Sequence, residues 1–392
     1  MALDADAIAW LRTPEGATAA EDATRALDGG TALLKVIDVL RRTHGPDHAR
    51  WAVTLAEGRA SARSKFEDAD RLFFDREAAE QATRDVVSRH TAQRFAGATR
   101  IADLGSGAGA DALALAEHAP VLAVDVDAGR AAMTAANAAA RGLPVETEVA
   151  DARAIDLAGV DAVWLDPARR DASGRITDPE RWSPPLSEAI RLARTVKRAG
   201  IKVAPGIDHD LVPSDAETEF ISLEGRLVEA VLWFGSAVTA ARRATALPEG
   251  VSMAGAPDVG ATPVRPPGAY LYDLDPAVGR AGLVDVLAPT IDAWLLSSGV
   301  GYLSGDDPRD TPFARRFRIL AWSPFSERWL LDACQAEGAA RVEVMRRASP
   351  VETNEIETRL NRALAGGSGR VLTVALTRVD GEHVAILTER ER

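Results

Sequence analysis

The spacing of apolar residues changes twice along the 392-residue chain. Up to about residue 95, apolar residues recur every three or four positions, which predicts helices separated by polar turns. From about 99 to 240, short apolar runs alternate with alanine-rich helical stretches, the pattern of a parallel sheet with crossover helices. The remainder mixes helical and strand-like stretches. We therefore expect an α/β protein of more than one domain.

The central region contains seven strand candidates. The last two are separated by only a short polar turn and must run antiparallel, because a parallel connection needs a crossover. The five before them are separated by helical stretches. We expect five parallel strands and a closing hairpin from the segments RIADLG, VLAVDV, ETEVAD, AVWLDP, IKVAP, FISLEG and VEAVLWFG.

Composition suggests where the domains end. Residues 255–270 are rich in glycine and proline, which is typical of a linker. In the tail, Asp380-Gly381 stands between two alternating runs, a strong signal for a tight hairpin. We predict a helical region over 1–95, a sheet domain over 96–250, a linker over 251–268 and a small α/β domain over 269–392.

Charge and cysteine content narrow the classes of function. The net charge is -12, and no run of about 18 apolar residues is long enough to span a membrane. Affinity for a nucleic-acid backbone needs lysine and arginine, so a general nucleic-acid coating protein is disfavoured, although a local basic track is not. The single cysteine, Cys334, allows no intramolecular disulfide and no multi-cysteine metal centre. We expect a cytoplasmic protein without a metal site or membrane contact, and the oligomeric state stays open.

A glycine-rich turn follows the first strand of the sheet domain. Gly105, Gly107 and Gly109 lack side chains and would let a ligand approach the backbone. With Ala110 in the last place, the same stretch also fits the dinucleotide pattern. Asp103 decides between the two interpretations, because a carboxylate there would repel a pyrophosphate but suits the ammonium and sulfonium of S-adenosylmethionine.

Two further acids follow successive strands. Asp125 ends the second strand, where a carboxylate can accept the hydroxyls of a ribose, and Asp151 ends the third, where it can take an adenine amino group. Each acid alone could be a loop or cap residue. Together with Asp103 they fall at the edge where open α/β sheets bind ligands, which favours S-adenosylmethionine as the cofactor.

The stretch from Asp103 to Asp166 resembles a class I S-adenosylmethionine (SAM)-dependent methyltransferase. The resemblance covers roughly residues 99–240. It implies a Rossmann-like sheet of seven strands, with the methionine part of the cofactor near Asp103 and Gly105, the ribose at Asp125 and the adenine at Asp151.

The whole chain is similar to a bacterial group that joins this domain to a helical amino-terminal part and a THUMP-like tail. The similarity lies in FFDREAAEQAT, DPARRDASGR, YLYDLDPAVGRAGLV and TPFARRFRILAWSPF. It implies an RNA-binding tail and an RNA substrate. The nearest reactions are those of RNA guanine-N2 methyltransferases such as trimethylguanosine synthase.

Asp166 and Pro167, at the end of the fourth strand, are the candidate catalytic residues. They resemble the Asp-Pro-Pro-aromatic motif of amino-methyltransferases, whose acid and following carbonyl accept hydrogen bonds from an exocyclic amine. Ala168 and Arg169 depart from that motif and remove the aromatic stacking surface, although an arginine plane also stacks on bases. A salt bridge between Asp166 and a neighbouring arginine is the structural alternative.

The candidate substrate-binding residues are Arg169, Arg170, Arg175 and His209. Arginine suits phosphates and base edges, and the chain has 46 lysines plus arginines of which four are lysines, leaving 42 arginines. Carbon-5 pyrimidine chemistry would need a nearby cysteine, and Cys334 belongs to another domain. Three hypotheses lead: methyl transfer to a base nitrogen of RNA, methyl transfer to a protein or small molecule, and a non-catalytic SAM- or RNA-binding adaptor. A dehydrogenase is a distant fourth.

Overall fold

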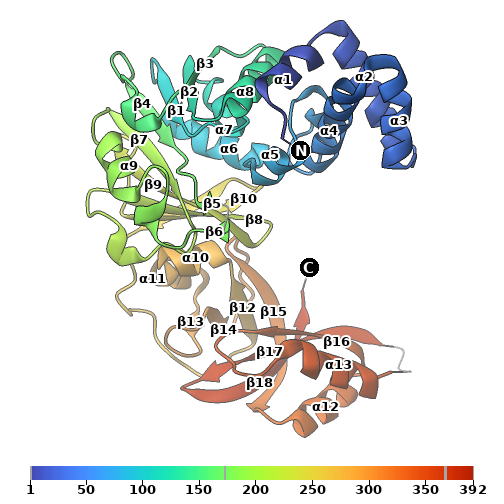
Figure 1. The fold of residues 1–392 in the computed structure, drawn as a ribbon. Coiled ribbons are helices and arrows are strands. Elements are labelled where there is room, and N and C mark those ends of the chain that lie inside the picture. Colours follow the sequence, from blue (N-terminus) through green and yellow to red (C-terminus); the bar gives the residue numbers. More distant parts are fainter. Residues whose placement is uncertain (1, 172–173, 366–368, 392) are drawn as a thin grey trace. The chain divides into compact units, whose positions relative to one another are not determined.

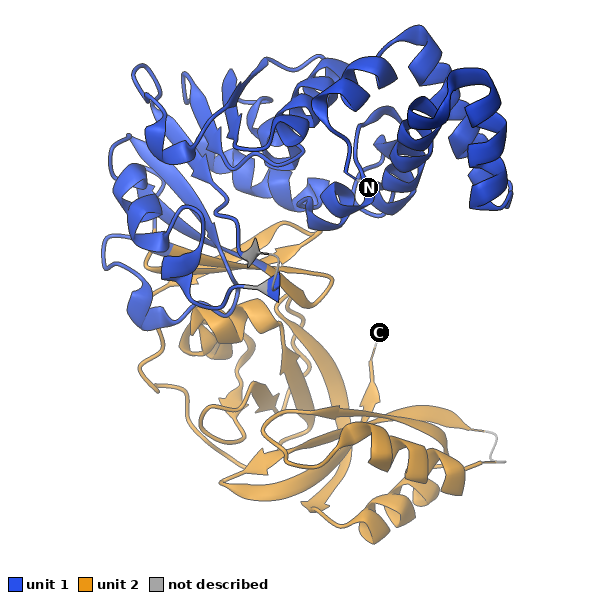
Figure 2. Ribbon diagram, viewed as in Figure 1, with its two compact units in different colours: residues 1–217, 229–239 blue, residues 218–228, 240–392 orange. Residues whose placement is uncertain are grey.

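The computed structural model describes residues 2–171, 174–365 and 369–391. The chain forms two compact units, which are shown in separate colours in Figure 2. The first comprises residues 1–217 and 229–239, and the second comprises residues 218–228 and 240–392.

The first unit opens with short helices. Capping residues mark where they begin: the Asp4 carboxylate accepts a hydrogen bond from the Ala7 amide at 2.8 Å, and Asp75 does the same for Ala78 at 2.7 Å. The helical period continues over residues 76–95, but the chain forms two helices there, with a break at residues 82–84. The helices are α1 (Ala5–Leu11), α2 (Pro14–Asp28), α3 (Leu33–His44), α4 (Pro46–Ala62), α5 (Arg76–Gln81) and α6 (Asp85–Ala92).

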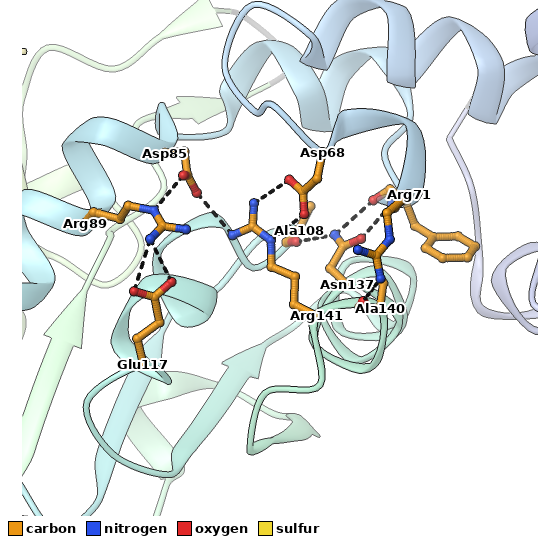
Figure 3. Close-up of polar contacts among 10 residues, drawn as sticks. Asp68, Arg71, Asp85, Arg89, Ala108, Glu117, Asn137, Ala140 and Arg141 are labelled. Carbon is orange, nitrogen blue, oxygen red and sulfur yellow. Dashed lines mark hydrogen bonds and ion pairs between the residues drawn. The ribbon is translucent and has the colours of Figure 1, made fainter.

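Charged and amide side chains fasten this helical part to α8 (Ala128–Arg141), as Figure 3 shows. The Arg141 guanidinium contacts Asp68 at 2.6 Å and Asp85 at 3.1 Å. Buried Asn137 accepts from the Phe73 amide at 2.6 Å and donates to the Ala108 carbonyl at 2.8 Å. Arg141 and Asn137 thus bind the segment just before α5, at Asp68 and Phe73, to the sheet domain.

The expected parallel strands are confirmed. Parallel pairing joins five neighbours in the order β7-β4-β1-β2-β3, and β9 runs antiparallel to β7. Helices α7 (Ala110–Leu115), α8 and α9 (Leu186–Ala193) provide crossovers. The strands are β1 (Ile101–Leu104), β2 (Val121–Asp125), β3 (Val145–Val149), β4 (Ala162–Leu165), β7 (Arg198–Val203), β8 (Glu217–Leu223) and β9 (Arg226–Gly235).

The sheet has nine strands and not the seven expected, in the order β11-β10-β8-β9-β7-β4-β1-β2-β3. The additional strands are β10 (Arg242–Leu247) and β11 (Val251–Gly255), which pair antiparallel with each other. The expected linker over 251–268 is therefore wrong at its start. Residues 251–255 alternate in side-chain size and find a partner strand across a tight turn, which local composition did not reveal.

The second unit contains a further sheet of seven strands, in the order β13-β14-β12-β15-β18-β17-β16. Its expected hairpin at Asp380-Gly381 is confirmed, with both residues at positive φ (47° and 83°). The strands are β12 (Tyr270–Leu274), β13 (Trp294–Leu295), β14 (Tyr302–Gly305), β15 (Ala314–Pro324), β16 (Ala339–Arg346), β17 (Arg370–Val379) and β18 (Glu382–Arg390).

The helices of the second unit are α10 (Pro276–Ala281), α11 (Val284–Leu287), α12 (Glu327–Ala336) and α13 (Thr353–Ala363), and α10 contacts β10 of the nine-stranded sheet (Figure 1). Helices α12 and α13 pack on one side of the seven-stranded sheet around Leu330, Cys334 and Leu360. Cys334 is fully buried in that core, where burial raises its thiol pKa to about 11, so it is not positioned as a nucleophile. Among the described helices, none has the length and apolar character needed to cross a membrane.

Candidate functional site

The glycine turn lies between β1 and α7. Gly105, Gly107 and Gly109 all have positive φ, at 90°, 55° and 88°. A Cβ atom on Gly105 would lie 2.6 Å from the carbonyl oxygen of Asp166, closer than non-bonded atoms can approach. Around Gly107 a Cβ would meet no atom within 4 Å, so its backbone faces open space. The turn brings the ends of β1 and β4 together and leaves room for a ligand beside Gly107.

Asp103 is buried within β1, with 1% of its surface exposed. Neither carboxylate oxygen has a hydrogen-bond partner among the described residues. Burial raises the pKa of this carboxyl well above its usual range, and the nearby acids Asp111 and Asp166 raise it further. A buried acceptor of this kind, left without a donor by the protein, suits a cationic ligand that brings its own donors.

Asp125 is bonded to the same turn. Its carboxylate accepts the Gly107 amide at 2.8 Å and the Asp127 amide at 2.9 Å, one on each oxygen. Burial raises the pKa of this carboxyl, and the two amide hydrogen bonds act against that rise. Each oxygen keeps a second lone pair for a hydroxyl donor.

Asp151 follows β3, as expected, but its carboxylate is already engaged. It caps the 3-10 turn at Ala152–Ala154 and pairs with the guanidinium of Arg153 at 2.5 Å. This hydrogen bonding lowers the pKa of Asp151 to about 2. An adenine amino group would therefore have to share Asp151 with Arg153, a contact that the sequence did not predict.

Asp166 lies directly after β4, and its amide donates to the Leu104 carbonyl at 3.1 Å, so it lies beside the glycine turn. Its partner among the described side chains is not Arg169: Oδ2 contacts the ammonium of Lys202 at 3.0 Å. The side chain of Arg170, the other arginine considered above, lies outside the described structure. The described residues donate no hydrogen bond to Oδ1, and 28% of the side chain is exposed. One carboxylate oxygen is therefore held in place, and the other has no donor among the described residues. Pro167 is buried.

The loop after Asp166 carries the candidate substrate-binding arginines. Ala168 pairs with Ser183 through two backbone hydrogen bonds of 2.8 and 3.1 Å, and Arg169 is half-buried. Arg170 and Arg175 belong to the backbone of the short strands β5 (Arg170–Asp171) and β6 (Gly174–Arg175). Their side chains lie outside the part of the structure that is described.

His209 follows β7 at the same edge of the sheet. It begins a 3-10 turn (His209–Leu211) that the Asp208 side chain caps by accepting the Asp210 amide at 3.0 Å. The imidazole is half-buried. The loop is therefore ordered by its own capping residue, and His209 stands beside the strand that carries Lys202.

Four further polar residues in this region were not predicted as site residues: Thr83, Asp111, Lys202 and Glu229. All but Thr83 are buried, at 3 to 8% exposure. A signal for two of them exists in the sequence, because Lys202 and Glu229 interrupt the apolar strands IKV and VEAVLWF. That signal marks a buried charge but does not say which groups it faces.

Three family models match separate parts of the chain. Residues 101–173 match the family model "Methyltransferase domain", residues 314–390 match "THUMP domain-like", and residues 4–62 match a domain of unknown function, DUF8688.

One curated relative is represented by two strains of Mycobacterium tuberculosis, CDC 1551 and H37Rv. It is named an uncharacterized S-adenosylmethionine-dependent methyltransferase. It is 33% identical over 358 residues, which covers 87% of this chain and 96% of the relative.

A solved structure has the same architecture over most of its length. It is a crystal structure from Porphyromonas gingivalis W83, of a protein provisionally named a methyltransferase. The TM-score is 0.73 at 18% sequence identity, over 94% of this chain and 98% of that one. At this level of identity the likeness concerns the fold.

Proposed function

Because the chain belongs to the SAM-dependent methyltransferases, we propose that it transfers a methyl group from SAM to a base nitrogen of RNA. Membership of the family makes the chain an enzyme and SAM its cofactor. The acceptor and the roles of individual residues are the content of the proposal.

Three acids and the glycine turn would hold the cofactor. Asp103 would face the ammonium and sulfonium, since its buried oxygens lack partners among the described residues. Asp125 would accept the ribose hydroxyls, and Asp151 would take the adenine amino group while sharing its charge with Arg153. When bound, SAM supplies a methyl group activated by its sulfonium. The backbone at Gly107 is open to it.

The single observation that carries the proposal is the position of Asp166. It directly follows β4 beside the glycine turn, with Oδ2 fixed by Lys202 and Oδ1 without a donor among the described residues. An exocyclic amine that donates to Oδ1 and to the Pro167 carbonyl has its lone pair turned toward the methyl donor. The methylated amine carries one proton too many, which a carboxylate at this position can accept.

RNA is the acceptor that the rest of the chain supports best. The THUMP-like match over 314–390 relates the tail to RNA-binding modules. Arginines outnumber lysines, 42 to four by the count above, and guanidinium groups suit phosphates and stack on bases. Arg169, Arg170, Arg175 and His209, in the loops after β4 and β7, would contact the substrate.

The test is an Asp166→Asn variant. We expect it to bind SAM within about threefold of the wild-type affinity. Methyl transfer should fall by about 100-fold or more, because the asparagine amide cannot accept the proton of the methylated amine as a carboxylate does. Calorimetry would measure SAM binding, and labelled methyl groups would be followed into total RNA. Asp38→Asn, at an exposed position in α3, is the matched control and should transfer at the wild-type rate. A fully active Asp166→Asn would contradict the proposal.

A protein or small-molecule acceptor is the second candidate, and the net charge of -12 favours it. It predicts labelled protein or metabolite and unlabelled RNA from the same reaction mixture. A non-catalytic adaptor predicts no turnover above that of Asp166→Asn. Fractionating one labelled lysate into RNA, protein and small molecules separates all three.

A further inference from the structure

Lys202 is a buried ammonium in the last parallel strand, with 6% of its surface exposed. Its Nζ atom donates to Thr83 Oγ1 at 2.6 Å and to Asp166 Oδ2 at 3.0 Å. Two more carboxylates, of Asp111 and Glu229, lie 3.5 Å away. Burying a charge costs several kcal/mol unless partners compensate it. The contacts with Thr83, Asp111, Asp166 and Glu229 provide that compensation and keep the ammonium beside Asp166.

The partners of Lys202 come from four separate parts of the chain. Asp166 follows β4, Asp111 is in α7 and Glu229 is in β9. Thr83 lies between α5 and α6 of the helical part and also donates to Asp111 Oδ2 at 2.9 Å. Contacts from so many directions fix the position of Nζ, and Nζ in turn fixes one oxygen of Asp166.

The acids outnumber the cation. Asp103, Asp111, Asp166 and Glu229 face Lys202, and oxygens of Asp103, Asp111 and Glu229 have no partner among the described residues. Burial acts to lower the pKa of Lys202, but the surrounding carboxylates outweigh it and the pKa is raised. Lys202 therefore stays charged in the physiological range.

Other charges also reach this group. Burial raises the pKa of Glu229, and the charge of Arg169 acts against that rise. From the helical part, the charge of Lys65 lies close enough to Lys202 for the two ammonium groups to repel each other. Lys65 donates to the backbone carbonyls of Glu80 and Ala82, so it does not replace Lys202 beside Asp166. Lys202 is the one cation in direct contact with Asp166 among the described residues.

We propose that Lys202 is a positioning residue for Asp166, set in place by Thr83, Asp111 and Glu229. This rests on the proposed function of Asp166. The ammonium donates to Oδ2, which holds the partly exposed carboxylate in one rotamer and directs Oδ1 toward the acceptor.

The experiment compares Lys202→Met with Lys202→Arg in the full chain. We expect the methionine variant to lower kcat for methyl transfer by at least about tenfold, with the KM for SAM changed by less than about threefold. The arginine variant keeps a donor cation and should recover most of the rate. Lys35→Met, at an exposed position in α3, is the matched control and should leave the rate unchanged.

The pH profile separates a positioning role from a merely structural one. Burial raises the pKa of both Glu229 and Asp103 and Lys202 opposes that rise, so removing Lys202 lets these acids hold a proton at still higher pH. The acid limb of the rate profile should therefore move to higher pH in Lys202→Met and stay in place in Lys202→Arg. Equal losses in both variants with an unchanged profile would overturn the proposal, and so would a methionine variant as active as wild type at every pH.

SAM binding gives a readout that needs no acceptor. Lys202 donates no hydrogen bond to Asp103, Asp125 or the glycine turn among the described contacts, so Lys202→Met should bind SAM about as tightly as wild type in calorimetry. A loss of SAM affinity beyond about tenfold would assign Lys202 to cofactor binding or folding and overturn the proposal.

A second variant covers the case in which Lys202→Met does not fold. Thr83→Val removes the acceptor at 2.6 Å from Nζ and keeps every charge, and Thr83→Ser restores it. We expect kcat to fall several-fold in the valine variant and to return in the serine variant. Equal activity in both would overturn the proposal.

Asp166→Asn keeps this inference distinct from the proposed function. If that variant is inactive while Lys202→Met is active, only the role of Lys202 fails. If Asp166→Asn is active, the proposed function itself fails.

Discussion

Asp125 joins the glycine turn to the expected ribose position through a single carboxylate. Removing that carboxylate leaves the Gly107 and Asp127 amides without their acceptor and removes the acceptor of the ribose hydroxyls. We expect Asp125→Ala to weaken SAM binding by on the order of 2 kcal/mol, which is about 30-fold in Kd. Calorimetry measures it, with Asp38→Ala as the control at an exposed position. An unchanged Kd would remove Asp125 from the cofactor site.

The raised pKa of Glu229 predicts how the free energy of unfolding depends on pH. Burial raises the pKa of its carboxyl from 4.5 to about 7, so between these values the folded state holds a proton that the unfolded state has released. The contribution of Glu229 to stability is therefore full below about pH 4.5 and is lost as the pH rises through 7.

Replacing Glu229 should relieve that loss. We expect Glu229→Gln to raise the free energy of unfolding at about pH 8 by on the order of 2 kcal/mol, and by much less at about pH 5. Thermal unfolding at both pH values measures it, with exposed Glu249→Gln as the control. A gain that is equal at both pH values would contradict the titration of Glu229.

Single residues also show where sequence-based reasoning stops. Asp103, Asp125 and Asp166 could be proposed as site residues because each lies in, at the end of or directly after a recognisable strand. Lys202 could not be assigned, because its role depends on the register that sets β7 between β4 and β9. The pairing of Asp151 with Arg153 depends on a local turn that no spacing rule specifies.

At the scale of elements, the glycine turn restricts the residue type most strictly, because Gly105 has no room for a side chain. Gly105 combines a φ of 90° with a carbonyl oxygen 2.6 Å from any added Cβ. We expect Gly105→Ala to cost on the order of 2 to 3 kcal/mol of stability and to abolish measurable SAM binding, because the turn must shift away from Asp166.

A matched control separates backbone strain from the close contact. Gly142 ends α8 at a φ of 67°, with nothing within 4 Å of an added Cβ. Gly142→Ala should cost only on the order of 1 kcal/mol and leave SAM binding unchanged. Thermal unfolding and calorimetry on both variants provide the comparison. Equal effects on SAM binding would show that the contact with Asp166 does not matter.

Elements with strong local patterns were predicted well, and those defined by their neighbours were not. The five parallel strands, the closing hairpin and the Asp380-Gly381 turn follow from apolar periodicity and turn chemistry. The break between α5 and α6 does not, because residues 82–84 keep a helical composition while Thr83 turns to Lys202. Strands β10 and β11 were missed because they extend an existing sheet edge.

At the scale of the whole molecule, the catalytic machinery and the tail support different parts of the account. The match over residues 101–173 and the relative at 33% identity establish the enzyme class and the cofactor. The THUMP-like tail supports RNA as the acceptor.

The central claim is that Asp166 directs methyl transfer to a base nitrogen of RNA. Its most direct test is mass spectrometry of RNA nucleosides from cells that lack the gene, complemented with the wild-type chain or with Asp166→Asn. The account predicts that one N-methylated nucleoside is lost with the gene, returns with the wild-type chain and stays absent with Asp166→Asn. Identical nucleoside profiles in all of these cells, or full restoration by Asp166→Asn, would contradict it.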